Sequence, residues 1–121
     1  MDNSRYDIFV TVGGRQLPMR NTTAAQIKIR KLLEGRDAEK LQPSEQIEAV
    51  LEAASVMINC AVAARNMEYG TEEKGLRKDE IALLASEEEL AEIVKAMKKL
   101  RSGDTRDIKT EEPEEKKENA E

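Results

Sequence analysis

The fold is decided by residues 7–20, which read DIFVTVGGRQLPMR. In the first half of this segment every second residue is aliphatic: Ile8, Val10 and Val12. This alternation is typical of a β-strand with one buried face. Gly13-Gly14 follows, and a glycine pair suits the positive backbone angles of a two-residue hairpin turn. The segment therefore predicts a β-hairpin.

The glycine turn also sets a register, because the residues on either side of it must pair. Counting outward from the turn pairs Val12 with Arg15, Val10 with Leu17 and Ile8 with Met19. The apolar residues of both strands then share one face, which supports the register independently. Pro18 has no N–H to donate, so the returning strand must be an edge or a bulge there. A lone hairpin is marginal in water, and we expect helices to cover its apolar face.

The residues after the hairpin carry the spacing and the caps of helices. A first helix is predicted from the capping box Thr23-Ala24-Ala25-Gln26 to a stop at Gly35. A longer helix is predicted from Pro43-Ser44 to about Glu68. Its stretch 53–64 is apolar or small on nearly every side, which is typical of a central helix covered on several faces.

Two more helical segments follow. Asp79 can cap a short one, and Ser86-Glu87-Glu88-Glu89 is a strong capping box for a longer one that ends at Gly103. Acidic residues at the start of this last helix and basic residues near its end match the helix dipole. Together the patterns predict a mainly α fold: a small helical domain, residues 1–103, with an N-terminal β-hairpin packed against the helices.

Composition narrows the chemistry that this chain can perform. Among 121 residues there is no His, which removes the commonest general base and the commonest zinc ligand. The one cysteine, Cys60, lies in the most apolar predicted helix, so we interpret it as a packed core thiol rather than a nucleophile. Aromatic residues make up only 2% and no basic stripe is visible, which argues against nucleic-acid binding. We therefore expect a non-enzymatic protein without a cofactor or a metal.

Three further features have both a structural and a chemical interpretation. Gly13-Gly14 lacks the Lys-Ser/Thr and the helix that follow the glycines of a phosphate loop, so a turn is favoured. Glu87 to Glu89 are explained by capping, since consecutive helix positions point in different directions. Asn59 and Arg65 are unusual on a buried helix, and we expect each to bond a neighbouring loop rather than a ligand.

Most of the net charge of −5 lies at the end of the chain. Residues 104–121 carry 8 acidic and 4 basic side chains, with Ile108 as their one larger apolar residue. Such a segment cannot bury enough surface to offset the entropy of ordering, so we expect an acidic disordered tail that is dispensable for folding. The N-terminus lacks the basic start and apolar stretch of a signal peptide, and we expect a cytoplasmic protein without a membrane span.

Three parts of the chain carry a family resemblance. They are the hairpin text over residues 7–20, the long Ala-rich helix ending in Asn66-Met67-Glu68-Tyr69-Gly70, and the acidic-capped segment from Lys78 to Leu100. In this layout the chain resembles the small tail assembly chaperones of long-tailed phages and prophages, in which a V-x-G-x-x-y-x-L/M-R hairpin precedes a helical body. The resemblance covers about residues 6–101 and brings no catalytic residues with it.

The resemblance implies a scaffolding role in tail morphogenesis. A protein of this kind binds the tape measure protein, keeps it soluble and helps recruit tail tube subunits in the host cytoplasm, and it is absent from the mature virion. Two alternatives stay open: a small cytosolic adaptor or regulator that binds another helical protein, and a structural head–tail component; self-association is open as well. The candidate partner-binding residues are an apolar stripe on the last helix that could instead serve the core alone: Leu90, Ile93, Met97 and Leu100.

Overall fold

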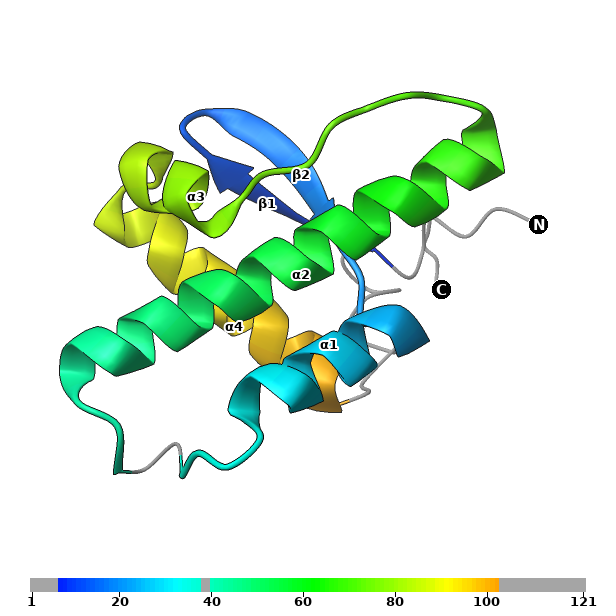
Figure 1. The fold of residues 1–121 in the computed structure, drawn as a ribbon. Helices are drawn as coiled ribbons and strands as arrows, with labels where there is room; N and C mark the ends of the chain where they lie inside the picture. Colours follow the sequence, from blue (N-terminus) through cyan, green and yellow to red (C-terminus); the bar gives the residue numbers. More distant parts are fainter. Residues whose placement is uncertain (1–6, 38–39, 103–121) are drawn as a thin grey trace, which may run out of the picture.

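The computed structural model describes residues 7–37 and 40–102, and in this part of the chain two strands and four helices follow the predicted order. They are β1 (Ile8–Val12), β2 (Arg15–Met19), α1 (Thr23–Leu33), α2 (Pro43–Tyr69), α3 (Lys78–Leu84) and α4 (Glu87–Ser102). The hairpin lies between α2 and α4, and α1 packs on α2 (Figure 1). The predicted fold class, mainly α with an N-terminal hairpin packed against the helices, is confirmed. The tail predicted over 104–121 lies outside the described residues.

The hairpin has the predicted register, in which Ile8 pairs with Met19, Val10 with Leu17 and Val12 with Arg15. Gly13 and Gly14 have φ values of 59° and 83°, as a type I′ turn requires at both central positions. From such a turn outward, hydrogen-bonded pairs alternate with non-bonded pairs. Pro18, opposite Phe9, therefore falls where an N–H would point away from β1, and the strand accommodates it at an outer edge without a bulge.

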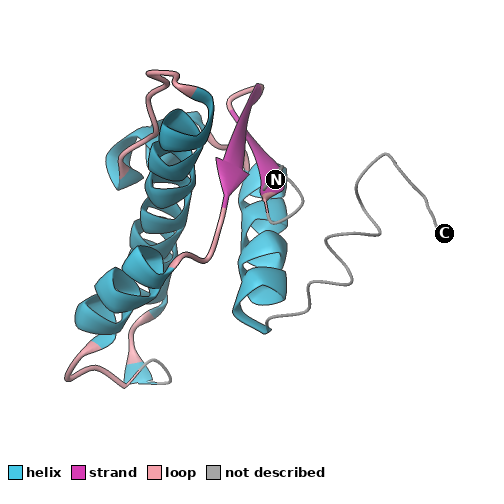
Figure 2. Ribbon diagram, turned by 90° about the vertical axis from the view of Figure 1, so that its right-hand side faces the viewer, coloured by secondary structure: helices cyan, strands magenta, loops and turns pink. Residues whose placement is uncertain are grey.

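The apolar face of the hairpin forms the middle of the core. Helix α2 packs mainly on β2 and α4 packs mainly on β1, with the two strands between them (Figure 2). From the strands, Val12, Leu17 and Met19 are almost fully buried. Helix α2 adds a buried stripe: Leu51, Ala54, Met57, Ile58, Ala61 and Val62. The core is thus built from aliphatic side chains of both strands and of the four described helices, as a chain with one Phe and no Trp requires.

The helix boundaries follow their caps, and two caps differ from the prediction. The Thr22 hydroxyl, rather than that of Thr23, accepts from the Ala25 N–H (3.0 Å), so the cap of α1 lies one residue earlier. The prediction that Asp79 caps α3 is wrong. Glu80 accepts from the Arg77 N–H (2.8 Å), which starts the helix at Lys78 and leaves Asp79 inside the first turn.

One carboxylate ties the turn of the hairpin to the start of α4. Ser86 and Glu89 form the predicted capping box, with the Glu89 N–H donating to the Ser86 hydroxyl (3.1 Å) and the Ser86 N–H donating to Glu89 Oε1 (3.0 Å). The same carboxylate accepts from the N–H groups of Gly13 (2.9 Å) and Gly14 (3.3 Å). The bonds from Gly13 and Ser86, with that from Gly14, hold the pKa of Glu89 below its ordinary value. Glu89 therefore caps a helix and anchors a turn at once.

Replacing Val10 with Asp should destabilise the fold strongly, because Val10 is only 5% exposed and a carboxylate there would be buried without a partner. We expect a loss of at least about 3 kcal/mol in urea denaturation followed by circular dichroism. Thr11→Asp is the matched control, since Thr11 is only half-buried and its side chain points to the other face of the same strand. It should cost less than about 1 kcal/mol, and equal losses in the two variants would contradict the assignment of the buried face.

Replacing Glu89 with Gln should lower the melting temperature near neutral pH and flatten its dependence on acid. The folded state lowers the pKa of Glu89, so its contribution is present above the unfolded value of about 4.3 and is lost as the pH falls through the folded value. Between about pH 7 and about pH 3 the wild-type chain should therefore lose more stability than Glu89→Gln. Glu88→Gln is the control, because the Glu88 carboxylate accepts no hydrogen bond from another described residue. Three indistinguishable pH profiles would refute this role of Glu89.

Candidate protein-interaction site

The apolar stripe of α4 that the sequence nominates for partner binding faces inward. Ile93, Met97 and Leu100 are buried in the core, and Leu90 is half-buried against it. Their burial agrees with the alternative interpretation of the stripe, in which it packs in the core. We therefore correct the site assignment: a partner would have to open the fold to reach them, and the surface for binding must be sought elsewhere.

The two polar residues expected to bond neighbouring segments do so. Asn59 Nδ2 donates to the carbonyl of Leu76 (2.9 Å), and the Ser55 hydroxyl donates to the same carbonyl (2.7 Å). Gly75 passes so close that a Cβ there would collide with the Asn59 amide, which explains a glycine at this point of the loop. Arg65 donates to Asp7, directly before β1. Cys60, from the same helix, is half-buried and packs against the core.

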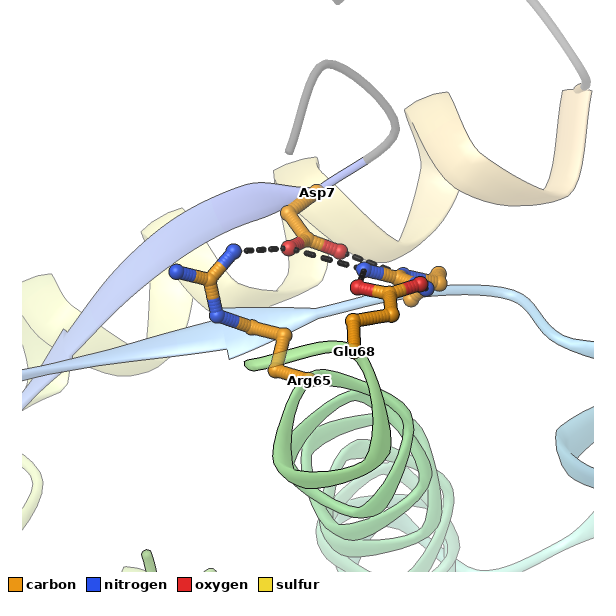
Figure 3. Close-up of polar contacts among 4 residues, drawn as sticks. Asp7, Arg65 and Glu68 are labelled. Carbon is orange, nitrogen blue, oxygen red and sulfur yellow. Dashed lines mark hydrogen bonds and ion pairs between the residues drawn. The ribbon is translucent and has the colours of Figure 1, made fainter. Parts of the chain in front are cut away.

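A buried carboxylate organises the surface at the C-terminal end of α2. The side chain of Asp7 is 0% exposed and lies between two arginines (Figure 3). Arg20 Nε donates to Asp7 Oδ1 at 2.6 Å, and Arg65 Nη1 donates to Asp7 Oδ2 at 2.7 Å. Arg20 Nη1 also donates to Glu68 at 2.9 Å. Asp7 and Glu68 together hold the pKa of Arg20 well above its ordinary value. We call Asp7, Arg20, Arg65 and Glu68 the charge cluster.

Arg65 joins the charge cluster to two aromatic rings. The carbon of its guanidinium lies 5.3 Å from the ring centroid of Phe9 and 5.0 Å from that of Tyr69, within cation–π range. Phe9 is 47% exposed and Tyr69 is 49% exposed. These are the two aromatic residues in the part of the chain that the structure describes, and both lie on the surface rather than in the core. We call Phe9, Arg65 and Tyr69 the aromatic–arginine patch.

A groove of about 370 Å³ opens beside the patch, between β2, the end of α2 and the loop that follows it. Its lining includes Pro18, Val62 and Tyr69. The loop is held in place by Asn66, whose Oδ1 accepts from the Glu73 N–H (3.0 Å) and whose Nδ2 donates to the Glu73 carbonyl (3.0 Å). Because Pro18 leaves the outer edge of β2 short of a donor, this edge is poorly suited to pair with another strand. The groove is better suited to take up side chains.

The groove presents charged, apolar and aromatic side chains to a ligand. Its charged lining consists of Arg15, Arg65 and Glu73, and a nucleophile paired with a base is not among the described lining residues. Among residues 7–37 and 40–102, no group of three or more His, Cys, Asp or Glu side chains is placed to hold a metal ion. What the site offers to a ligand is shape, two half-exposed rings and an oriented guanidinium.

The comparisons with known proteins add no family to this description: no protein-family model, no curated protein and no solved structure matches the chain. One property of the chain bears on its location. Helix α2 is long and apolar enough to cross a membrane by length and composition alone, a weak criterion that the core helix of a soluble protein also meets. Six of its residues face the core of this fold.

Replacing Asp7 with Ala should cost much more than replacing Glu68, because only Asp7 is fully buried. Its loss leaves two partly buried arginines side by side without their carboxylate, and breaking a buried pair from one side costs about 3–5 kcal/mol. Glu68→Ala removes a carboxylate that is 24% exposed and should cost about 1 kcal/mol or less. Urea denaturation of both variants measures the difference, and a Glu68→Ala chain as unstable as Asp7→Ala would contradict the central position of Asp7.

Proposed function

We propose that this chain is a non-enzymatic tail assembly chaperone of a long-tailed phage or prophage, which binds the tape measure protein through the aromatic–arginine patch. The observation that carries the proposal is the position of Phe9 and Tyr69. In a chain so poor in aromatic residues, both rings are kept half-exposed against one arginine instead of filling the core. Tyrosine and arginine are, with tryptophan, the residue types enriched among the residues that contribute most to binding at protein interfaces.

The charge cluster supports this role by holding the patch in one geometry. Arg65 is fixed by a 2.7 Å bond to the buried carboxylate of Asp7, and the two rings pack on the fixed guanidinium. A surface that is ordered before binding loses less conformational entropy when a partner arrives. The groove beside the patch gives a neighbouring apolar side chain of that partner a place to enter.

The identity of the partner rests on the family resemblance. A tape measure protein is a long helical chain with apolar faces, and such a face presents side chains rather than a free strand edge. The groove and the aromatic–arginine patch can bind such side chains. The edge of β2 is a poor partner for another strand, because Pro18 has no N–H to donate. The chaperone keeps such a face covered until tail tube subunits assemble around it.

Co-expression with a tape measure protein encoded beside this chain tests the proposal. The wild-type chain should raise the soluble fraction of that protein and copurify with it. The double variant Phe9→Ser/Tyr69→Ser should lose about 2 kcal/mol of binding free energy, or about 30-fold in Kd, measured by titration calorimetry. Ile27→Ser/Leu83→Ser is the matched control, since both of these apolar side chains are exposed and lie on other elements. It should bind as tightly as the wild type.

Melting temperatures separate lost binding from lost folding in these variants. A Phe9→Ser/Tyr69→Ser chain that melts like the control but binds like the wild type would refute the patch as the contact surface. A wild-type chain that neither solubilises nor binds the tape measure protein would refute the chaperone function. Presence of the chain in purified virions would favour the head–tail component instead.

A further inference from the structure

The outer edges of the two strands differ in how they are closed. On β2, Pro18 has no N–H, and the N–H of Arg20, two residues further along, donates to the carbonyl of Met57 on α2 (3.3 Å). The edge of β2 is therefore closed at two successive outward positions. The edge of β1 has neither protection, because its sequence, IFVTV, contains no proline and no charged residue, and the strand has no bulge.

The edge of β1 carries backbone groups without a partner in the described part of the chain. Counted from the turn, Phe9 and Thr11 lie at the non-bonded positions of the ladder, opposite Pro18 and Gln16. Their N–H and C=O groups therefore point away from β2. Within residues 7–37 and 40–102 none of these groups forms a hydrogen bond. Such a row of donors and acceptors is a template for a further strand.

A groove lies beside this edge, between β1 and α4. Its volume is about 110 Å³, and its lining includes Phe9 and Val10 from the strand and Glu92, Lys95 and Ala96 from the helix. The charged side chains of this lining have both signs, so the groove favours neither an acidic nor a basic occupant. An uncharged strand is the occupant that fits, and β1 of a second copy is such a strand.

We propose that the edge of β1 pairs with β1 of a second copy, antiparallel, so that two hairpins form one four-stranded sheet. The argument for this occupant is self-complementarity. In a pair centred on Val10, Phe9 of each copy lies opposite Thr11 of the other, and every outward N–H and C=O of these residues finds a partner. A two-fold axis makes both halves of the contact identical, as in most homodimers.

The pairing also fits the two faces of the sheet. Residues directly opposite each other on antiparallel strands share a face, so the apolar faces of the two hairpins become one, with Val10 beside Val10 of the second copy. The side chain of Phe9 stays on the outer face in both copies. The dimer does not rest on the proposed function, but under that function it presents two aromatic–arginine patches on one face to a long partner.

Analytical ultracentrifugation of the full-length chain tests the proposal. The wild-type chain should be a monomer at low micromolar concentration and form a dimer toward millimolar concentration, because a few hydrogen bonds across a short strand pair give a weak contact. Thr11→Pro removes an outward N–H from each copy and should raise the dimer Kd at least about tenfold. Gln16→Pro is the matched control, since Gln16 lies opposite Thr11 and its N–H points outward from the edge of β2. It should dimerise like the wild type.

Melting temperatures at low concentration separate lost pairing from lost folding in the two proline variants. A second measurement needs no variant: in a mixture of isotope-labelled and unlabelled wild-type chains, filtered NOEs should connect the amide of Phe9 with the amide of Thr11 in the second copy. The proposal is overturned by a wild-type chain that stays monomeric at millimolar concentration, or by a dimer without these NOEs. A folded Thr11→Pro chain that dimerises as tightly as Gln16→Pro also overturns it.

Discussion

The fold depends on burying one face of a two-stranded hairpin. Two strands alone are only marginally stable in water. Here α2 packs against β2 and α4 packs against β1, so the hairpin lies between the two helices. The two helices meet each other far less than each meets the hairpin. Met19 and Val12 of the hairpin are almost fully buried in the core, and removing the hairpin would leave both helices with an uncovered apolar stripe.

Polar groups hold the hairpin at both of its ends. At the turn, Glu89 accepts from the N–H groups of Gly13 and Gly14 while it caps α4. At the open end, Asp7 binds Arg20, directly after β2, and Arg65 on α2. Each carboxylate thus joins the hairpin to a different helix. Since a buried charge is tolerated only with partners, we expect the charge cluster to select one placement of the hairpin against α2 more than it adds net stability.

The same cluster connects the fold to the proposed binding surface. Arg65 is common to the Asp7 ion pair and to the contacts with Phe9 and Tyr69. The interaction that positions β1 therefore also orients the rings that we propose as the contact surface. Arg65 and Tyr69 also line the groove, which runs along β2 and the end of α2.

Local patterns were enough to predict the hairpin, its register and the capping box at Ser86, because each depends on residues near one another in sequence. One step beyond the pair of Ile8 and Met19, the same register places Asp7 opposite Arg20. Arg65 could not be added to that pair from sequence, since it comes from a helix 45 residues further along the chain.

The apolar stripe on α4 shows a second feature that the sequence alone does not decide, namely whether such a stripe packs in the core or binds a partner. An apolar stripe is required both by a core-facing helix and by a partner-binding helix, so its spacing does not distinguish the two. The alternation in the first strand already places Phe9 on the face opposite Ile8, Val10 and Val12, but the contact of Arg65 with both Phe9 and Tyr69 depends on how α2 packs in three dimensions.

Native-state hydrogen exchange tests most directly the claim that the hairpin is the centre of the core and not an appendage. The relevant amides are those that bond across the ladder, at Val10, Val12, Leu17 and Met19, and those of the buried middle of α2, at Met57 and Ile58. If the hairpin is the centre of the core, both groups exchange only by global unfolding, with the same free energy and the same dependence on denaturant. Hairpin amides that open at a markedly lower free energy while α2 and α4 stay protected would contradict it.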